Sequence, residues 1–171
     1  VVFGDADIAA AAEGISIAGF FNAGQDCTAA TRVLCHADAY DDFVSALAEQ
    51  AKGLKTGQPD DEDVLFGPVN NPNQLAHVSG LVSRAPSHAN VVAGGNKVAG
   101  DGFFFEPTVV AGLQQQDEMT QNEIFGPVIT VQKFTDEDEA VRYANGVQYA
   151  LASSVWSRDF GTAMRMAKRL D

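Results

Sequence analysis

Residues 128–146, VITVQKFTDEDEAVRYANG, contain the pattern on which the fold prediction rests. The first seven residues are rich in β-branched and apolar side chains, which is typical of a buried strand. The acidic residues that follow suit the first turn of a helix, because a helix N-terminus carries partial positive charge. Gly146 is a typical residue just past a helix end. This stretch therefore predicts one buried strand followed directly by one helix.

The same alternation of strands and helices extends along the chain on both sides of this stretch. Further helices are predicted over residues 8–22, 39–54, 73–85 and 161–170. Further strands are predicted over residues 31–36, 90–95, 150–157 and at the end of 100–110. Asp5 or Asp7 can cap the first helix, and residues 55–72 are expected to form a loop rich in Gly, Pro and Asp.

Such alternation favours an α/β fold with a largely parallel open sheet and helices on both faces. Ligands in these folds generally bind beyond the carboxyl ends of the strands, so we expect the site there. No repeat or low-complexity linker divides the 171 residues, so a single domain is predicted.

Composition narrows the classes of partner. The chain is 46% hydrophobic, which is enough for a core, and its net charge is −12. This charge disfavours nucleic acid and anionic membranes as partners, because phosphate binding needs clustered Lys and Arg. No apolar run is long enough for a transmembrane helix. Two cysteines do not make a disulfide framework, so a reducing, cytoplasmic location is expected.

Cys27, in the stretch FFNAGQDCTAA (residues 20–30), is the principal catalytic candidate. A free cysteine is most often a small buried apolar residue. A loop position and small neighbours instead favour a nucleophile, because substrate can approach and backbone N–H groups can stabilise an oxyanion. Cys35 lies within a predicted strand and is expected to be core. No metal site is expected, because the cysteines and histidines lack ligand spacing.

Two other classes of function stay open at this point. A cysteine hydrolase or acyltransferase would need a histidine ring nitrogen within about 4 Å of the Cys27 sulfur. None of His36, His77 and His88 is an obvious partner from its position in the sequence. A non-catalytic interaction domain that retains the fold is the second alternative.

Glu123, in QNEIFGP (residues 121–127), is a second candidate site residue. It could be a solvated loop residue. It could also bind a sugar diol, since an ionised carboxylate accepts two hydrogen bonds. The chain has neither a GxGxxG nor a Walker motif, so no familiar pyrophosphate loop is present.

Four blocks, in this order, resemble NAD(P)-dependent aldehyde dehydrogenases. They are FFNAGQDCTAATR (20–32), GGNKVAGDGFFFEPTVV (94–110), NEIFGPVITVQKF (122–134) and ANGVQYALASSVWSRD (144–159). The sequence NAGQDCTA is most similar to that of the gamma-aminobutyraldehyde and betaine-aldehyde dehydrogenases. The resemblance implies oxidation of an aldehyde, such as 4-aminobutanal, to its acid with NAD or NADP.

The resemblance also implies a role for individual residues. Cys27 matches the nucleophile that forms a thiohemiacetal and then a thioester, and its backbone N–H would supply half of the oxyanion hole. Glu123 matches the residue that holds the nicotinamide-ribose hydroxyls, and Phe125 matches the aromatic residue beside the nicotinamide. Gln74 falls where some members contact the adenosine-side ribose.

By the same resemblance, residues 1–171 are a catalytic domain without most of the dinucleotide-binding domain or the C-terminal oligomerisation segment. The general-base glutamate and the oxyanion asparagine of the family fall outside the chain. We therefore expect the full-length protein to form a homo-oligomer, and the isolated chain to bind NAD poorly without turnover.

Asp26 precedes Cys27 directly. A carboxylate beside a thiol disfavours the thiolate, because like charges repel. It would be useful if the substrate carries a cation, as an ω-amino aldehyde or a quaternary ammonium does. We hypothesise that Asp26 faces the substrate tunnel. The alternative is that its side chain caps a nearby backbone N–H.

Overall fold

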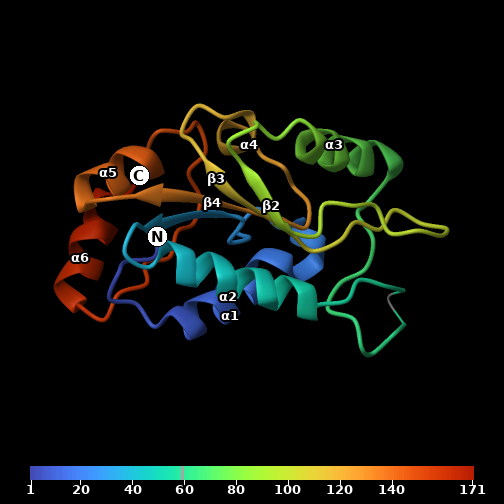
Figure 1. The fold of residues 1–171 in the computed structure, drawn as a ribbon, viewed down its shortest axis with the longest axis horizontal. Helices are drawn as coiled ribbons and strands as arrows, with labels where there is room; N and C mark the ends of the chain where they lie inside the picture. Colours follow the sequence, from blue (N-terminus) through green and yellow to red (C-terminus); the bar gives the residue numbers. More distant parts are fainter. Residues whose placement is uncertain (59) are drawn as a thin grey trace.

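The computed structural model places a four-stranded sheet between helices (Figure 1), and it describes residues 1–58 and 60–171. The strands are β1 (Arg32–His36), β2 (Asn90–Ala93), β3 (Thr108–Leu113) and β4 (Val128–Phe134). The helices are α1 (Ile8–Phe20), η1 (Phe21–Gly24), α2 (Tyr40–Gly53), α3 (Pro72–Ser83), α4 (Glu118–Gln121), α5 (Glu137–Ala144) and α6 (Phe160–Arg169). Pro59, within the loop predicted over 55–72, lies outside the described residues.

The sheet has the strand order β1-β4-β3-β2. β4 is parallel to both β1 and β3, whereas β2 is antiparallel to β3 at the edge. Val33 pairs with Val131, and Val109 pairs with Ile129. The prediction of a largely parallel open α/β sheet is therefore confirmed.

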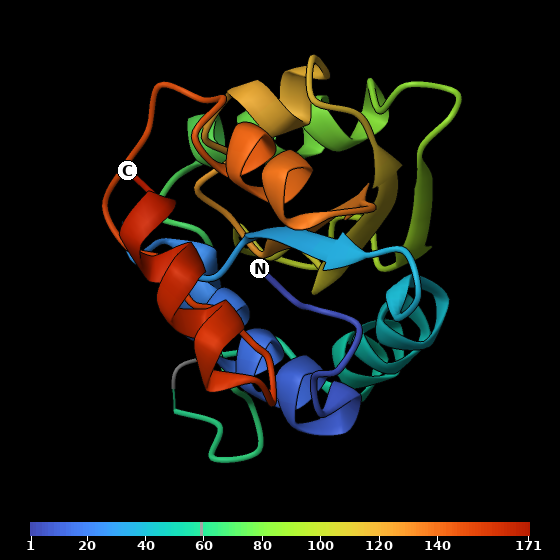
Figure 2. The same cartoon turned by 90° about the vertical axis from the view of Figure 1, so that its left-hand side faces the viewer.

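Helices cover both faces of the sheet, as Figure 2 shows. On one face, side chains of α1 and α2, including Phe43 and Leu47, are buried with Val33 and Val131. On the opposite face, side chains of α3 and α4 are buried with Val110 and Val128. Successive strand residues point to opposite faces, so the apolar-rich strands supply both cores.

Helix α1 begins at the predicted residue. Asp7 caps it, and its carboxylate accepts a hydrogen bond from Ala10 N at 3.2 Å. Ile17 is 52% exposed, so one side of the helix faces solvent. The helix is closely packed elsewhere, since a Cβ on Gly19 would lie 2.7 Å from Ile129 Cδ1 and a Cβ on Gly14 would lie 2.7 Å from the Trp156 ring.

The strand predicted over 150–157 is a correction. Among the described residues this segment makes only an isolated bridge, between Trp156 and Val2. Trp156 N donates to Val1 O at 2.9 Å, and Phe3 N donates to Trp156 O at 3.0 Å. Residues 150–154 are exposed despite their apolar-rich sequence. A strand needs a partner along its length, and here the pairing is limited to residues 1–3.

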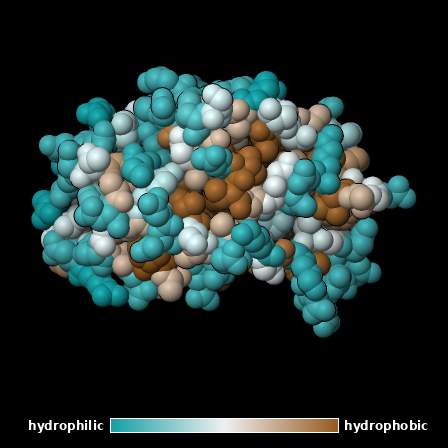
Figure 3. All heavy atoms as spheres, viewed as in Figure 1, coloured by the Kyte–Doolittle hydropathy of each residue, from teal (hydrophilic) through white to brown (hydrophobic). Residues whose placement is uncertain are grey.

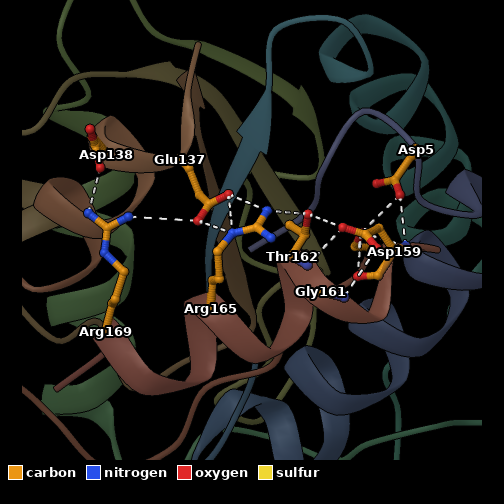
Figure 4. Close-up of polar contacts among 9 residues, drawn as sticks. Asp5, Glu137, Asp138, Asp159, Gly161, Thr162, Arg165 and Arg169 are labelled. Atoms are coloured by element: carbon orange, nitrogen blue, oxygen red, sulfur yellow. Dashed lines mark hydrogen bonds and ion pairs between the residues drawn. The ribbon is translucent and has the colours of Figure 1, made fainter.

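Polar contacts attach α6 to the rest of the fold (Figure 4). The Asp5 carboxylate accepts hydrogen bonds from the Ser157 hydroxyl at 2.9 Å and from the N–H groups of the next two residues. Asp159 caps α6 and accepts from Thr162 N at 2.9 Å. Arg165 of α6 pairs with Glu137 of α5 at 2.9 Å. Asp5, one of the two caps considered for α1, therefore serves the turn before α6.

The surface is mostly polar on the face shown in Figure 3, with an apolar area near the middle, over β2. Val91 of this edge strand is 42% exposed. Within the described part of the chain, no helix combines the length and apolarity needed to cross a membrane.

Candidate active site

The candidate residues lie at the amino ends of two neighbouring strands. Cys27 precedes β1, and the segment 123–126 precedes β4. Because β1 and β4 are adjacent and parallel, both loops lie at the same edge of the sheet. The candidate residues therefore do not lie beyond the carboxyl ends of the strands, where we expected the site, because both segments enter strands instead of leaving them.

A left-handed turn delivers the chain from α1 to Cys27. Asn22, Ala23 and Gly24 have φ values of 52°, 56° and 67°. A Cβ on Gly24 would lie 2.0 Å from Gly126 O, so only glycine allows this approach. The turn before Cys27 therefore rests directly on the segment before β4.

Cys27 and Glu123 line one cleft of about 740 Å³. The walls come from residues around 27–34, 119–124 and 144–154. Cys27 is an exposed free thiol. Its backbone N–H has no hydrogen-bond acceptor among residues 1–58 and 60–171, which leaves it available to an oxyanion.

The second cysteine has the opposite character. Cys35 is buried within β1, as predicted. Burial raises the pKa of the Cys35 thiol to about 12. This thiol is therefore protonated at neutral pH and shielded from reagents.

No histidine lies among the described residues that line the cleft. His36 Nε2 contacts Thr135 O at 2.9 Å, and His88 Nε2 contacts Asp117 Oδ2 at 2.8 Å. His77 lies on α3, and its Nε2 is 3.4 Å from Glu123 O. The cysteine hydrolase alternative gains no support, because no histidine of the described residues lines the cleft with Cys27.

Asp26 adopts the conformation of the capping alternative. Its Oδ1 accepts hydrogen bonds from Thr28 N and Thr28 Oγ1, both at 2.7 Å. These two bonds lower the pKa of Asp26, so the carboxylate is ionised at neutral pH. Asp26 is not among the described residues that line the cleft.

Phe125 and Gln74 lie beside the cleft and contact each other. Phe125 is 39% exposed and has a left-handed φ of 53°. The Gln74 amide donates to Ile124 O at 3.0 Å and to Phe125 O at 2.8 Å. Both amide hydrogens are thus used, so a ribose hydroxyl would have to meet the carbonyl oxygen of Gln74. The cofactor contacts of Glu123, Phe125 and Gln74 stay predictions.

Two residues at the cleft were missed from the sequence. Tyr149 accepts a hydrogen bond from Glu123 N at 3.4 Å through its hydroxyl. Arg32 lines the cleft and donates to Tyr143 O at 2.7 Å, at the end of α5. Arg32 could have been found from the sequence, because a single arginine in the strand TRVLCH needs a polar partner. Nothing in the sequence singled out Tyr149.

The described residues contain no group of three or more His, Cys, Asp or Glu side chains that could hold a metal ion.

Comparisons with known proteins define the class. A family model described as "Aldehyde dehydrogenase family" matches residues 1–171. An aldehyde dehydrogenase of Emericella nidulans is 36% identical over 171 residues, 99% of this chain and 34% of the relative. Because the model matches the whole chain, the chain belongs to the aldehyde dehydrogenase family.

Solved structures agree in fold. The lactaldehyde dehydrogenase of Escherichia coli superposes with a TM-score of 0.95 at 34% identity, over 99% of this chain and 36% of that one. The betaine aldehyde dehydrogenase of Staphylococcus aureus, crystallised with NAD+, superposes with a TM-score of 0.94 at 36% identity, over 99% and 35%. The chain spans about a third of the length of these relatives.

Proposed function

We propose that the chain carries the nucleophile of an NAD(P)-dependent aldehyde dehydrogenase that oxidises an amino aldehyde, such as 4-aminobutanal, to its acid. The observation that supports this most directly is the exposed Cys27 thiol, which shares a cleft with Glu123. Family membership supports the reaction class. The sequence around Cys27 and the similarity to a betaine aldehyde dehydrogenase support the substrate class.

Cys27 begins the chemistry. Its thiolate attacks the aldehyde carbon, a C–S bond forms, and the carbonyl π electrons move to oxygen. The Cys27 backbone N–H donates to this oxyanion and so lowers the barrier. When bound, the nicotinamide supplies the acceptor for the hydride that leaves the thiohemiacetal carbon, which becomes a thioester. Water then adds at that carbon, the C–S bond breaks, and acid and thiol are released.

The residues present fit one end of the dinucleotide. Glu123 lies in the cleft, and an ionised carboxylate can accept hydrogen bonds from both hydroxyls of a ribose. The exposed Phe125 ring follows it by two residues and would border the nicotinamide. Residues for the pyrophosphate, the general base and the second oxyanion donor are proposed to lie outside this chain.

The preference for a cationic substrate is proposed from Asp26, whose carboxylate is ionised and whose residue is half-buried, one position before the proposed nucleophile. Its bonds to Thr28 occupy Oδ1. Because Asp26 is not among the described residues that line the cleft, an attraction to a substrate cation would be mainly through space rather than through direct contact, and would weaken with added salt. Homo-oligomerisation of the full-length protein is proposed from the family, and a cytoplasmic location from the two cysteines, which make no disulfide framework.

Thiol labelling tests the nucleophile without requiring turnover. We expect iodoacetamide to label Cys27 at least about 100-fold faster than Cys35, because the latter is buried and protonated. Saturating aldehyde should slow the labelling of Cys27, since a thiohemiacetal blocks the sulfur. Mass spectrometry of peptides measures both rates. Cys27 labelling that is as slow as Cys35 labelling, or unaffected by aldehyde, would favour a non-catalytic domain.

A matched pair of aldehydes tests the substrate class. Betaine aldehyde and 3,3-dimethylbutanal have the same shape but differ by one positive charge. We expect Asp26→Asn to weaken protection by the cationic aldehyde several-fold and to leave the neutral one unchanged. Equal effects on both aldehydes would contradict a role for Asp26 in substrate choice.

A further inference from the structure

The segment that carries Glu123 and Phe125 is held by α3. The Gln74 carboxamide donates one hydrogen to Ile124 O at 3.0 Å and the other to Phe125 O at 2.8 Å. Gln74 is itself fixed at the start of α3, where its backbone N–H donates to the Asn71 side chain at 2.9 Å. A side chain with two donors in one plane thus joins two successive carbonyls.

These carbonyls flank a backbone conformation that is unfavourable by itself. Phe125 has a φ of 53°, and left-handed backbone costs free energy in any residue with a Cβ. Such a conformation persists only where the surroundings impose it. Phe125 is 39% exposed, so burial of this residue alone does not impose the conformation. The two hydrogen bonds from Gln74 are the contacts that act on the Phe125 peptide groups directly.

The clamped segment is also joined to the turn before Cys27. A Cβ on Gly126 would lie 2.5 Å from Val78 Cγ2 of α3, and a Cβ on Gly24 would lie 2.0 Å from Gly126 O. Helix α3, the segment 124–126 and the turn 22–24 are therefore stacked without space between them. A shift of the middle layer would move both neighbours relative to each other.

We propose that Gln74 is a positioning residue. Its carboxamide holds Phe125 in the left-handed conformation, and this sets the Phe125 ring and Glu123 at the edge of the Cys27 cleft. The functional meaning of this clamp rests on the function proposed above, since it assigns Glu123 and Phe125 to the cofactor.

Gln74→Glu removes both donors and keeps the size of the side chain. A carboxylate suits the first turn of a helix, so α3 itself should not be weakened. Asn73→Asp, one residue earlier on α3, makes the same amide-to-acid change at an exposed position and serves as the control. Gln74→Asn is a second variant, which keeps the donors but is one methylene too short to reach both carbonyls.

Fluorine NMR gives the direct measurement. With 4-fluorophenylalanine in place of Phe125, we expect one sharp resonance in the chain with Gln74 and in Asn73→Asp. In Gln74→Glu and Gln74→Asn the resonance should move by more than its linewidth or split. An unchanged resonance in both Gln74 variants would overturn the proposal.

Chymotrypsin gives an independent measurement on the unlabelled chain. We expect cleavage after Phe125 to become about tenfold faster in Gln74→Glu, because loss of two hydrogen bonds raises the open population of the segment. Cleavage after the distant, exposed Phe160 should not change, which separates local release from general unfolding. Equal acceleration at both sites, or at neither, would contradict the clamp.

The two proposals fail in different ways. If Phe125 depends on Gln74 in these assays but aldehyde does not protect Cys27 from alkylation, the proposed function is wrong and the clamp stands. If aldehyde protects Cys27 but Phe125 is insensitive to Gln74, the clamp is wrong and the proposed function stands.

Discussion

At the scale of single residues, Gly24 decides how closely the Cys27 turn approaches the segment before β4. It combines a left-handed φ of 67° with a position whose Cβ would overlap the Gly126 carbonyl. Either feature alone favours glycine, and together they exclude any other residue without movement of the backbone. Because Gly24 has no side chain, the turn before the candidate nucleophile Cys27 can lie against the proposed cofactor segment.

Gly24→Ala should therefore destabilise the fold by about 3 kcal/mol or more, from backbone strain and overlap combined. Urea unfolding measures the change in the free energy of unfolding. Gly53→Ala is the matched control, because Gly53 ends α2 and its added Cβ would meet nothing within 4 Å. That variant should be neutral or slightly stabilising. A Gly24→Ala protein as stable as Gly53→Ala would contradict the role given to Gly24.

At the scale of elements, Arg32 connects β1 to the end of α5. It donates to Tyr143 O at 2.7 Å and to Ala144 O at 3.4 Å, where the helix carries partial negative charge. Gln115 accepts from Arg32 at 3.3 Å and donates to Gly146 O at 2.8 Å. Burial lowers the pKa of the Arg32 guanidinium, although it stays charged at neutral pH. These contacts fix the start of the loop 145–154, which forms one wall of the cleft.

Arg32→Met should destabilise the fold by about 2 kcal/mol, because it leaves helix carbonyls without donors in a partly buried place. Arg32→Met should also accelerate hydrogen exchange, and this acceleration should be larger in the loop 145–154 than in β4. Arg158→Met is the control, since Arg158 is exposed and its ion pair with Asp7 spans 3.6 Å. If both substitutions have the same small effect, the anchoring role of Arg32 is wrong.

At the scale of the whole molecule, the two ends of the described chain are joined by Asp5 and Trp156. The Asp5 carboxylate binds the turn 157–159, which lies more than 150 residues further along the chain. Trp156 packs over α1, where a Cβ on Gly14 would lie 2.7 Å from its ring. Trp156 is the only tryptophan of the sequence, so its fluorescence reports directly on this junction.

The junction should be sensitive to acid. Burial acts to raise the pKa of Asp5, but hydrogen bonds from the Ser157 hydroxyl and from the backbone N–H groups of Asp159 and Arg158 outweigh it and leave the pKa below its ordinary value. A lowered pKa stabilises the fold fully above the ordinary value near 4 and loses this effect as pH falls through the folded value. We therefore expect Trp156 emission to shift to the red below about pH 4, before far-UV circular dichroism changes.

Asp5→Asn tests the assignment. This variant cannot ionise, so most of the acid-induced change in Trp156 emission should disappear. Identical pH profiles for Asp5→Asn and the unchanged chain would show that other carboxylates control the junction.

Most of the secondary structure could be predicted because its causes are local. The strand–helix unit at 128–146, the Asp7 cap and the helical spacing in α2 and α3 depend on residues close in sequence. The segment 150–157 could not be predicted in the same way. Its apolar composition matched a strand, but pairing depends on which backbone lies beside it, and only residues 1–3 do.

The sequence by itself determined the α/β class, the burial of Cys35 and the choice of Cys27 as candidate nucleophile, because these depend on composition, periodicity and local motifs. Only the tertiary structure decided the edge of the sheet at which Cys27 lies, the engagement of Asp26 by Thr28, and the clamp of Gln74 on Phe125. The bond between Asp26 and Thr28 joins residues two positions apart, but the sequence did not determine which of its possible conformations Asp26 adopts. The sheet edge and the Gln74 contact depend on residues about 50 to 100 positions apart, which are brought together by strand pairing and packing.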